Sequence, residues 1–292
     1  MNTVSKTFII SALAVAITPL TSAVAEADGM PQKSSADVKK PAATQKPPVA
    51  KKPAARDERA IGALRTMGEF LRAQKNFSVS TTTDTDYVTD TGQKITVSAH
   101  GKLDVQRPDK LRAELTSDRK ERQFFYDGKT FTIFSPKLGF YSTVEAPPTI
   151  RELADALETR FGLQLPLVDL FRWGDEKADF GQITLAGYVG PAKLDGVDTD
   201  QYTFRQKGVD WQIWIEKGDK PVPHKLVLTT TDAKARPEFA INMKWSLDAK
   251  HSDATFSFVA PKDSAQIALE ELAPRPEIDN TTRAKRSARR ER

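Results

Sequence analysis

The sequence predicts a mainly β protein of the α+β class: a curved, antiparallel, unclosed half-barrel of about ten or eleven strands that is covered by helices. Three observations support this prediction. Apolar and polar residues alternate with the two-residue period of half-buried strands over much of the chain. Asp-Gly turns of the β-hairpin kind separate several of these runs. Some strands are apolar on both faces and need cover, and a sheet of this size usually curls.

The chain begins with the three zones of a secretory signal peptide. Lys6 supplies the positive start, residues 8–17 form an apolar run, and an A-x-A cleavage site ends at Ala25. The run of roughly 10 residues is too short to cross a hydrocarbon core of about 30 Å as a helix. We therefore expect cleavage near Ala25 or Ala27 and export to the periplasm, with an uncleaved membrane anchor as the alternative.

The chain has no cysteine, so it cannot be lipid-anchored through an acylated cysteine and cannot form disulfides. We divide it into four parts on composition. Residues 1–25 are the signal peptide, and residues 26–56 are a disordered linker rich in Pro, Ala and Lys. Residues 57–273 form the half-barrel domain, and residues 274–292 form a disordered basic tail.

Positive charge is concentrated in the two flanks. The linker and residues 275–292 carry +4 each, the signal peptide carries +1 and the whole chain +5, which leaves −4 for residues 57–274. An acidic domain argues against nucleic-acid binding, which needs a basic face on the folded unit. The basic flanks suit contact with an anionic membrane surface, or they are only soluble, disordered ends.

Two segments have helical periodicity. Residues 57–75 place apolar side chains on one helical face and charged side chains on the other. Residues 148–172 open with Pro-Pro-Thr and form the second candidate. The apolar positions are Ile61, Leu64, Met67 and Leu71 in the first segment, and Ile150, Leu153, Leu157 and Phe161 in the second.

After the first helix the period changes to two. In residues 94–105, Ile95 and Val97 point to one face while hydroxyl and charged side chains point to the other. The same alternation returns at 111–115 and at 239–247, where one face is wholly apolar. Turn signals separate the strands at residues 90–92, 107–109, 127–129, 195–196 and 217–219.

Three strands are apolar on both faces, so both faces of the sheet need cover. A curled sheet of this kind encloses a concave, apolar interior, which is a natural ligand site. The residues concerned are Phe131, Ile133 and Phe134, then Phe140 and Tyr141, and finally Trp211, Ile213, Trp214 and Ile215.

The sequence offers no catalytic or metal-binding pattern. His100, His224 and His251 are far apart, and none has a partner at metal-ligand spacing. The lack of cysteine excludes thiol nucleophiles, and no G-x-S-x-G elbow occurs. We therefore predict a protein that is not an enzyme and needs no cofactor and no metal.

Two weaker patterns have simple structural explanations. Residues 128–130 resemble the end of a phosphate-binding loop but lack its upstream glycine, so they predict a hairpin turn. The acidic groups around Asp86 and Asp198 lack the spacing of an EF-hand. Paired carboxylates of the glycosidase kind have no specific support.

Three stretches of the chain resemble a family of predicted periplasmic proteins of unknown function, related to the LolA/LolB lipoprotein-carrier superfamily. The resemblance covers about residues 57–270. It is specific in the first two stretches and looser in the third. The stretches are residues 125–132 (FYDGKTFT) with 138–141 (LGFY); residues 147–153 (PPTIREL) with 165–171 (LPLVDLF); and residues 195–197, 202–204, 211–216 (WQIWIE) and 223–226 (PHKL).

The resemblance implies an unclosed barrel with helices at its mouth, in which the carriers shield acyl chains from water. We expect a non-enzymatic binder or carrier of a lipid or other acyl-chain ligand. The alternative is an envelope sensor or scaffold that binds a protein partner through the same fold. The residues expected to line the cavity are Phe125, Phe134, Tyr141 and Trp214, whose other explanation is core packing under the helices.

Overall fold

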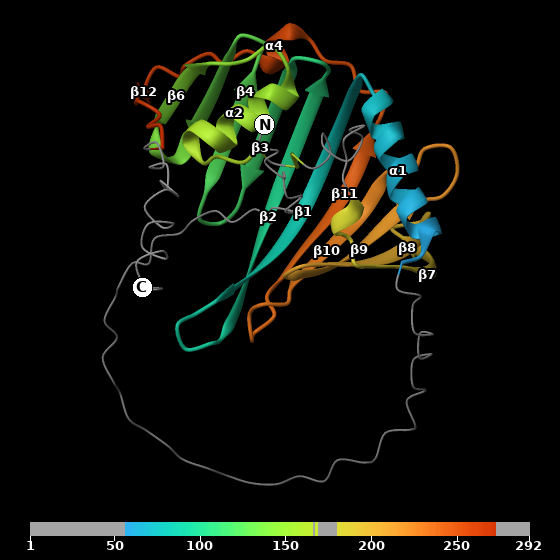
Figure 1. Ribbon diagram of the computed structural model, residues 1–292. Coiled ribbons are helices and arrows are strands. Elements are labelled where there is room, and N and C mark those ends of the chain that lie inside the picture. The colour runs from blue at the N-terminus through green and yellow to red at the C-terminus, as the bar shows by residue number, and fades with distance from the viewer. Residues whose placement is uncertain (1–55, 166, 169–179, 273–292) are drawn as a thin grey trace, which may run out of the picture.

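The computed structural model describes residues 56–165, 167–168 and 180–272 (Figure 1). The signal peptide, the linker up to residue 55 and the basic tail lie outside the described residues. So does part of the second predicted helix, at residues 166 and 169–172.

One twelve-stranded sheet organises the domain, in the order β12-β6-β5-β4-β3-β2-β1-β11-β10-β9-β8-β7. All neighbouring strands are antiparallel except β12 and β6, which are parallel. The predicted mainly β fold with an unclosed, curved antiparallel sheet is confirmed. The strands are β1 (Asn76–Val88), β2 (Lys94–Gln106), β3 (Lys110–Thr116), β4 (Glu121–Tyr126), β5 (Thr130–Ser135), β6 (Phe140–Glu145), β7 (Leu185–Leu194), β8 (Val197–Gln206), β9 (Val209–Glu216), β10 (Pro223–Thr230), β11 (Glu238–Ser246) and β12 (Ala265–Gln266).

Two α-helices lie over one face of the sheet, and β1 and β2 run between them (Figure 1). We refer to this face as the inner face and to the opposite one as the outer face. The described helices are α1 (Glu58–Ala73), α2 (Ile150–Phe161) and the single turn α4 (Asp253–Phe256), with short 3₁₀ turns at Pro136–Leu138 and Phe180–Gln182.

Helix α1 is held by its cap and by one buried face. The side chain of Asp57 accepts a hydrogen bond from the Arg59 N–H at 2.9 Å, which satisfies a free donor of the first turn. The Asp57 N–H donates to the Ala186 carbonyl of β7 at 3.0 Å, so the start of the helix is fixed to the sheet edge. The predicted apolar face is confirmed, because Ile61 and Met67 are completely buried in the core.

Helix α2 is shorter than the predicted 148–172 helix. Thr149 caps its start by accepting from the Glu152 N–H at 3.2 Å. It ends at Phe161 because Gly162 adopts a left-handed conformation, φ 64°, and its N–H donates back to the Glu158 carbonyl.

The segment before α2 is bound to β4 by a side-chain hydrogen bond. The Tyr126 hydroxyl donates to the Pro147 carbonyl at 2.5 Å, and burial raises the pKa of this tyrosine.

The alternation predicted from the sequence determines which side chains enter the core. On β11, Ile241 and Met243 are buried on the inner face, while Asn242 between them and Lys244 after them are exposed. Residues of β1 pair with β2 from Asn76–Gln106 to Val88–Lys94 and with β11 from Ser78–Ser246 to Thr85–Phe239. One core cluster therefore extends from α1 across the sheet to α2.

The C-terminal strap, which we define as residues 253–272, runs from the outer face around the β6 edge to α2. It begins with an ion pair between Asp253 and Lys110 of β3. Strand β12 then pairs with β6, and the Ser142 hydroxyl donates to the Ile267 carbonyl at 2.8 Å. The strap ends where the Leu272 N–H donates to the Arg160 carbonyl of α2 at 2.6 Å.

No helix in the described ranges is long and apolar enough to cross a membrane.

We predict that Phe258→Ala lowers the free energy of unfolding by about 2–3 kcal/mol, because Phe258 packs between three rings of the outer face. The control Val259→Ala changes a side chain that is 83% exposed and should cost less than about 0.5 kcal/mol. Urea denaturation measures both. Equal, small effects would show that the strap does not stabilise the domain.

Candidate functional site

The middle of the inner face is made of small side chains. Thr81 lies opposite Gly101, and Thr83 lies opposite Ala99, so these four residues form a central strip on β1 and β2. Both threonines are buried, at 7% and 8% exposure. The strip lies between the two ends of the sheet that α1 and α2 cover (Figure 1).

Larger apolar side chains border this central strip. Met243 lies beside Thr81 and Ile241 beside Thr83 on β11, while Leu115 of β3 lies beside Gly101. The central strip is tightly packed at Gly101, because a Cβ on this residue would lie 2.5 Å from the Thr81 Oγ1. This part of the inner face therefore has small side chains in its middle and larger apolar side chains beside them.

The apolar inner face continues past the strip into the β1–β2 hairpin. Thr85 pairs with Val97, and Tyr87 pairs with Ile95. Exposure rises along this direction, and Ile95 is 45% exposed. The hairpin projects beyond both helices (Figure 1). The strip therefore leads from the covered centre of the sheet to an open, partly apolar end.

Three of the four aromatic residues expected to line a cavity lie together, but on the outer face. Phe125, Phe134 and Tyr141 alternate with the core residues of β4, β5 and β6. Their rings surround Phe258 of the strap, with ring centroids 5.3, 5.5 and 5.0 Å from it. A ligand would reach them only after Phe258 moved, so a role in ligand contact stays a prediction.

Trp214, the fourth residue, lies apart from this group on β9. It points away from the core face, where its neighbours Ile213 and Ile215 are buried. The Lys225 ammonium lies 5.2 Å from its ring centroid, a cation–π contact across the β9–β10 pair. Trp214 therefore does not join the other three in one site.

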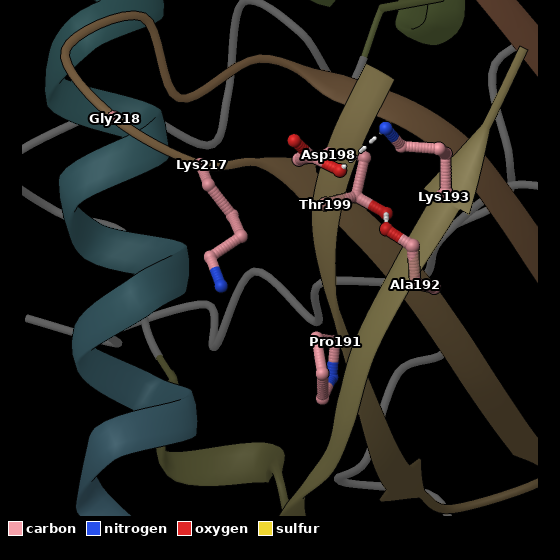
Figure 2. A pocket seen from close by; sticks show the side chains of 7 residues that line it. All are labelled: Pro191, Ala192, Lys193, Asp198, Thr199, Lys217 and Gly218. Atoms are coloured by element: carbon pink, nitrogen blue, oxygen red, sulfur yellow. Dashed lines mark hydrogen bonds and ion pairs between the residues drawn. The ribbon is translucent and has the colours of Figure 1, made fainter. Parts of the chain in front are cut away.

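A pocket of about 550 Å³ lies near the turn of the β7–β8 hairpin, where Lys217 and Gly218 complete its lining. Figure 2 shows the Lys193–Asp198 ion pair, 3.2 Å, and the hydrogen bond from the Thr199 hydroxyl to the Ala192 carbonyl, 3.0 Å. Lys217 also points into it and lies 3.7 Å from Asp200. The charged side chains of its lining are thus paired, Lys193 with Asp198 and Lys217 with Asp200.

Several titratable side chains of the domain lie against polar partners. The His224 Nε2 lies 2.8 Å from Glu216, and the His251 Nε2 lies 3.4 Å from the Phe77 carbonyl. Hydrogen bonds from Thr96, with Lys94 nearby, lower the pKa of Asp86. Among the residues that the structure describes, no group of three or more His, Cys, Asp or Glu side chains could hold a metal ion.

Sequence reasoning missed the central strip and the role of Phe258. Thr81 and Thr83 lie in a run of hydroxyl residues on β1, and no apolar pattern marks which face is buried. The signal lies in the partner strand β2, where Ala99 and Gly101 occupy the same alternating positions as the apolar residues. Phe258 lies in a segment without periodicity, so only the fold places it.

A family profile described as "Predicted periplasmic protein (DUF2092)" matches residues 60–270. The chain belongs to this family. Its description places the family in the periplasm and names no ligand. A search of curated proteins found no significant match.

Several solved structures have a similar course of the chain. Lipoprotein LppX of Mycobacterium tuberculosis is 10% identical with a TM-score of 0.42, covering 67% of this chain and 98% of its own. A LolA superfamily protein of Nitrosomonas europaea is 12% identical with a TM-score of 0.34, covering 68% and 97%. A conserved protein of Thermus thermophilus is 11% identical with a TM-score of 0.40, covering 72% and 99%. Similarities at this level identify no ligand for this chain.

We predict that Gly101→Ala lowers the free energy of unfolding by about 1–3 kcal/mol, because the added methyl group would meet the Thr81 hydroxyl. Thr81→Ala should recover part of this loss in the double variant, and a double-mutant cycle by thermal unfolding measures the coupling. Gly62→Ala in α1 is the control, since nothing lies within 4 Å of its new Cβ, and it should stabilise by about 0.5–1 kcal/mol. Additive effects of the first two changes would mean that the strip is not closely packed there.

Proposed function

We propose that this protein is an exported, non-enzymatic binding protein that sequesters or carries a lipid or other acyl-chain ligand on the inner face of its sheet. The observation that carries the proposal is the central strip of Thr81, Thr83, Ala99 and Gly101, which leads between apolar walls to an open end. Transfer of hydrocarbon from water to such a face gains about 0.8 kcal/mol per buried CH₂. Binding of this kind needs no catalytic group and no cofactor.

Export is supported by two independent features. The N-terminal residues have the charged, apolar and small-residue order of a cleavable signal peptide. The family to which the chain belongs is described as periplasmic. The mature protein then has basic residues on both sides of an acidic domain, which supports a reversible, electrostatic contact of these flanks with anionic membrane surfaces.

A second candidate is an envelope scaffold that binds a protein partner. It is favoured by the projecting β1–β2 hairpin, where Val88 and Ile95 are 41% and 45% exposed. Such a partner would contact the outside of the hairpin tip and leave the covered strip unused. Blocking the strip therefore separates the two candidates.

We expect Thr83→Phe to lower the affinity for a long-chain fatty alcohol carrying a terminal pyrene by at least about tenfold, since the ring would fill the strip. The matched control is Thr82→Phe, which places the same ring on the exposed outer face opposite His100 and should stay within about twofold of wild type. Fluorescence titration of the purified mature protein measures both.

Circular dichroism of each variant checks that it is folded. A milder pair of the same design is Ala99→Val on the inner face, with Ser98→Val on the outer face as its control. Failure of the wild-type protein to take up the probe, or equal affinities of Thr83→Phe and Thr82→Phe, would contradict the proposed function.

Processing gives a further prediction. The protein recovered from the periplasm of an expressing bacterium should begin at Glu26 or Asp28, directly after one of the two alanine cleavage sites. N-terminal sequencing by mass spectrometry reads this directly. An intact Met1 in the membrane fraction would instead support an uncleaved anchor.

A further inference from the structure

The inner face of the β8–β9 hairpin buries one hydrogen-bond acceptor and one donor that have no partner. The Oε1 of Gln206 and the Nε1 of Trp211 are both inaccessible and make no hydrogen bond in the described structure. The two side chains are 8% and 3% exposed. A buried polar group without a partner is costly, so such a group in a native protein indicates a missing water or ligand.

The two groups are neighbours on one face. Gln206 pairs with Val209, and Phe204 pairs with Trp211, so Gln206 and Trp211 are diagonal partners whose side chains lie roughly 7 Å apart or less. The Trp211 ring is held by stacking on Phe204, with centroids 4.2 Å apart and planes at 23°. A single polar group placed between the two side chains would be within hydrogen-bonding distance of both.

The pair lies on the same face as the central strip. Across the sheet, Trp211 is beside Leu228, which is beside Phe239, which is beside Thr85 of β1. Thr85 is the next inner-face residue of β1 after Thr83. Three strand spacings, roughly 14 Å, therefore separate the pair from the strip along an apolar row, a distance that a long acyl chain spans.

The charges of the hairpin do not point at this pair. Arg205 and Asp210 alternate to the outer face and bind each other, with Nε–Oδ1 at 2.5 Å and Nη2–Oδ2 at 2.8 Å. Arg236 adds a second contact to Asp210 at 3.5 Å, and the hydrogen bond from Arg205 is the main cause of the lowered Asp210 pKa. At this pair the inner face thus leaves one neutral donor atom and one neutral acceptor atom without a protein partner.

We infer that Gln206 and Trp211 bind the head group of the acyl ligand, and that this head group is an uncharged group that both donates and accepts a hydrogen bond, such as a hydroxyl. The Trp211 N–H donates to the ligand oxygen, and the ligand O–H donates to the Gln206 carbonyl. This inference rests on the proposed function, since it specifies the head group of the same ligand. An anionic carboxylate or phosphate only accepts, so it would leave the Gln206 Oε1 in its present position unpaired.

The test compares a long-chain alcohol with its methyl ether, which has the same chain but cannot donate. Competition against the pyrene probe should show that wild type prefers the alcohol by about tenfold. Gln206→Met keeps the side-chain length, removes the amide acceptor and should abolish this preference without weakening binding of the ether by more than about twofold. Trp211→Phe should weaken both ligands, because both accept from the indole N–H.

Gln201→Leu is the matched control. Gln201 lies on the outer face of the same strand, where its amide already donates to Gln212 at 2.8 Å, so this variant should keep the full preference for the alcohol. Thermal unfolding of the unliganded proteins gives a second readout. Gln206→Met should be at least as stable as wild type, because it removes an unpaired buried acceptor.

The outcomes are distinguishable. If wild type binds alcohol and ether equally and Gln206→Met unfolds at a lower temperature, a buried water satisfies the pair and the inference is overturned, while the proposed function stands. If wild type binds neither ligand, both the inference and the proposed function are wrong.

Discussion

The pairing of β1 with both of its neighbours is the interaction on which the rest of the structure depends. Strand β1 binds β2 along its full thirteen residues, and it binds β11 over eight register pairs. It thereby joins the strands that come before α2 in the chain to those that come after it. Because β1 pairs with both neighbours, the inner face is continuous, and helices α1 and α2 can cover its two ends.

The same pairing of β1 explains why a ligand site is proposed at the centre of the sheet. Each helix buries its apolar face on one end, where large side chains such as Ile61 and Leu153 complete the core. Between the helices the strands carry Thr, Ala and Gly instead. Small side chains offer few packing contacts of their own, and protein interiors gain stability from close contact. A ligand chain on the inner face would supply such contacts.

Sequence patterns predicted the sheet, the first helix and the core faces, because alternation and helical periodicity are local properties. They failed for α2 beyond Phe161, where a left-handed Gly162 ends the helix although apolar residues continue. They also grouped Phe125, Phe134, Tyr141 and Trp214 without assigning a face. Long-range placement of Phe258 and of β12 decides which of these rings are covered, and no local signal carries that information.

Native mass spectrometry of the protein purified from the periplasm, without exposure to detergent, tests lipid binding most directly. A binding protein for acyl chains should appear with an added mass that gentle collisional activation removes and that lipid analysis of the released material identifies. A protein that appears only at the mass of its own chain, and that stays so after incubation with a long-chain alcohol, would contradict ligand binding on the inner face.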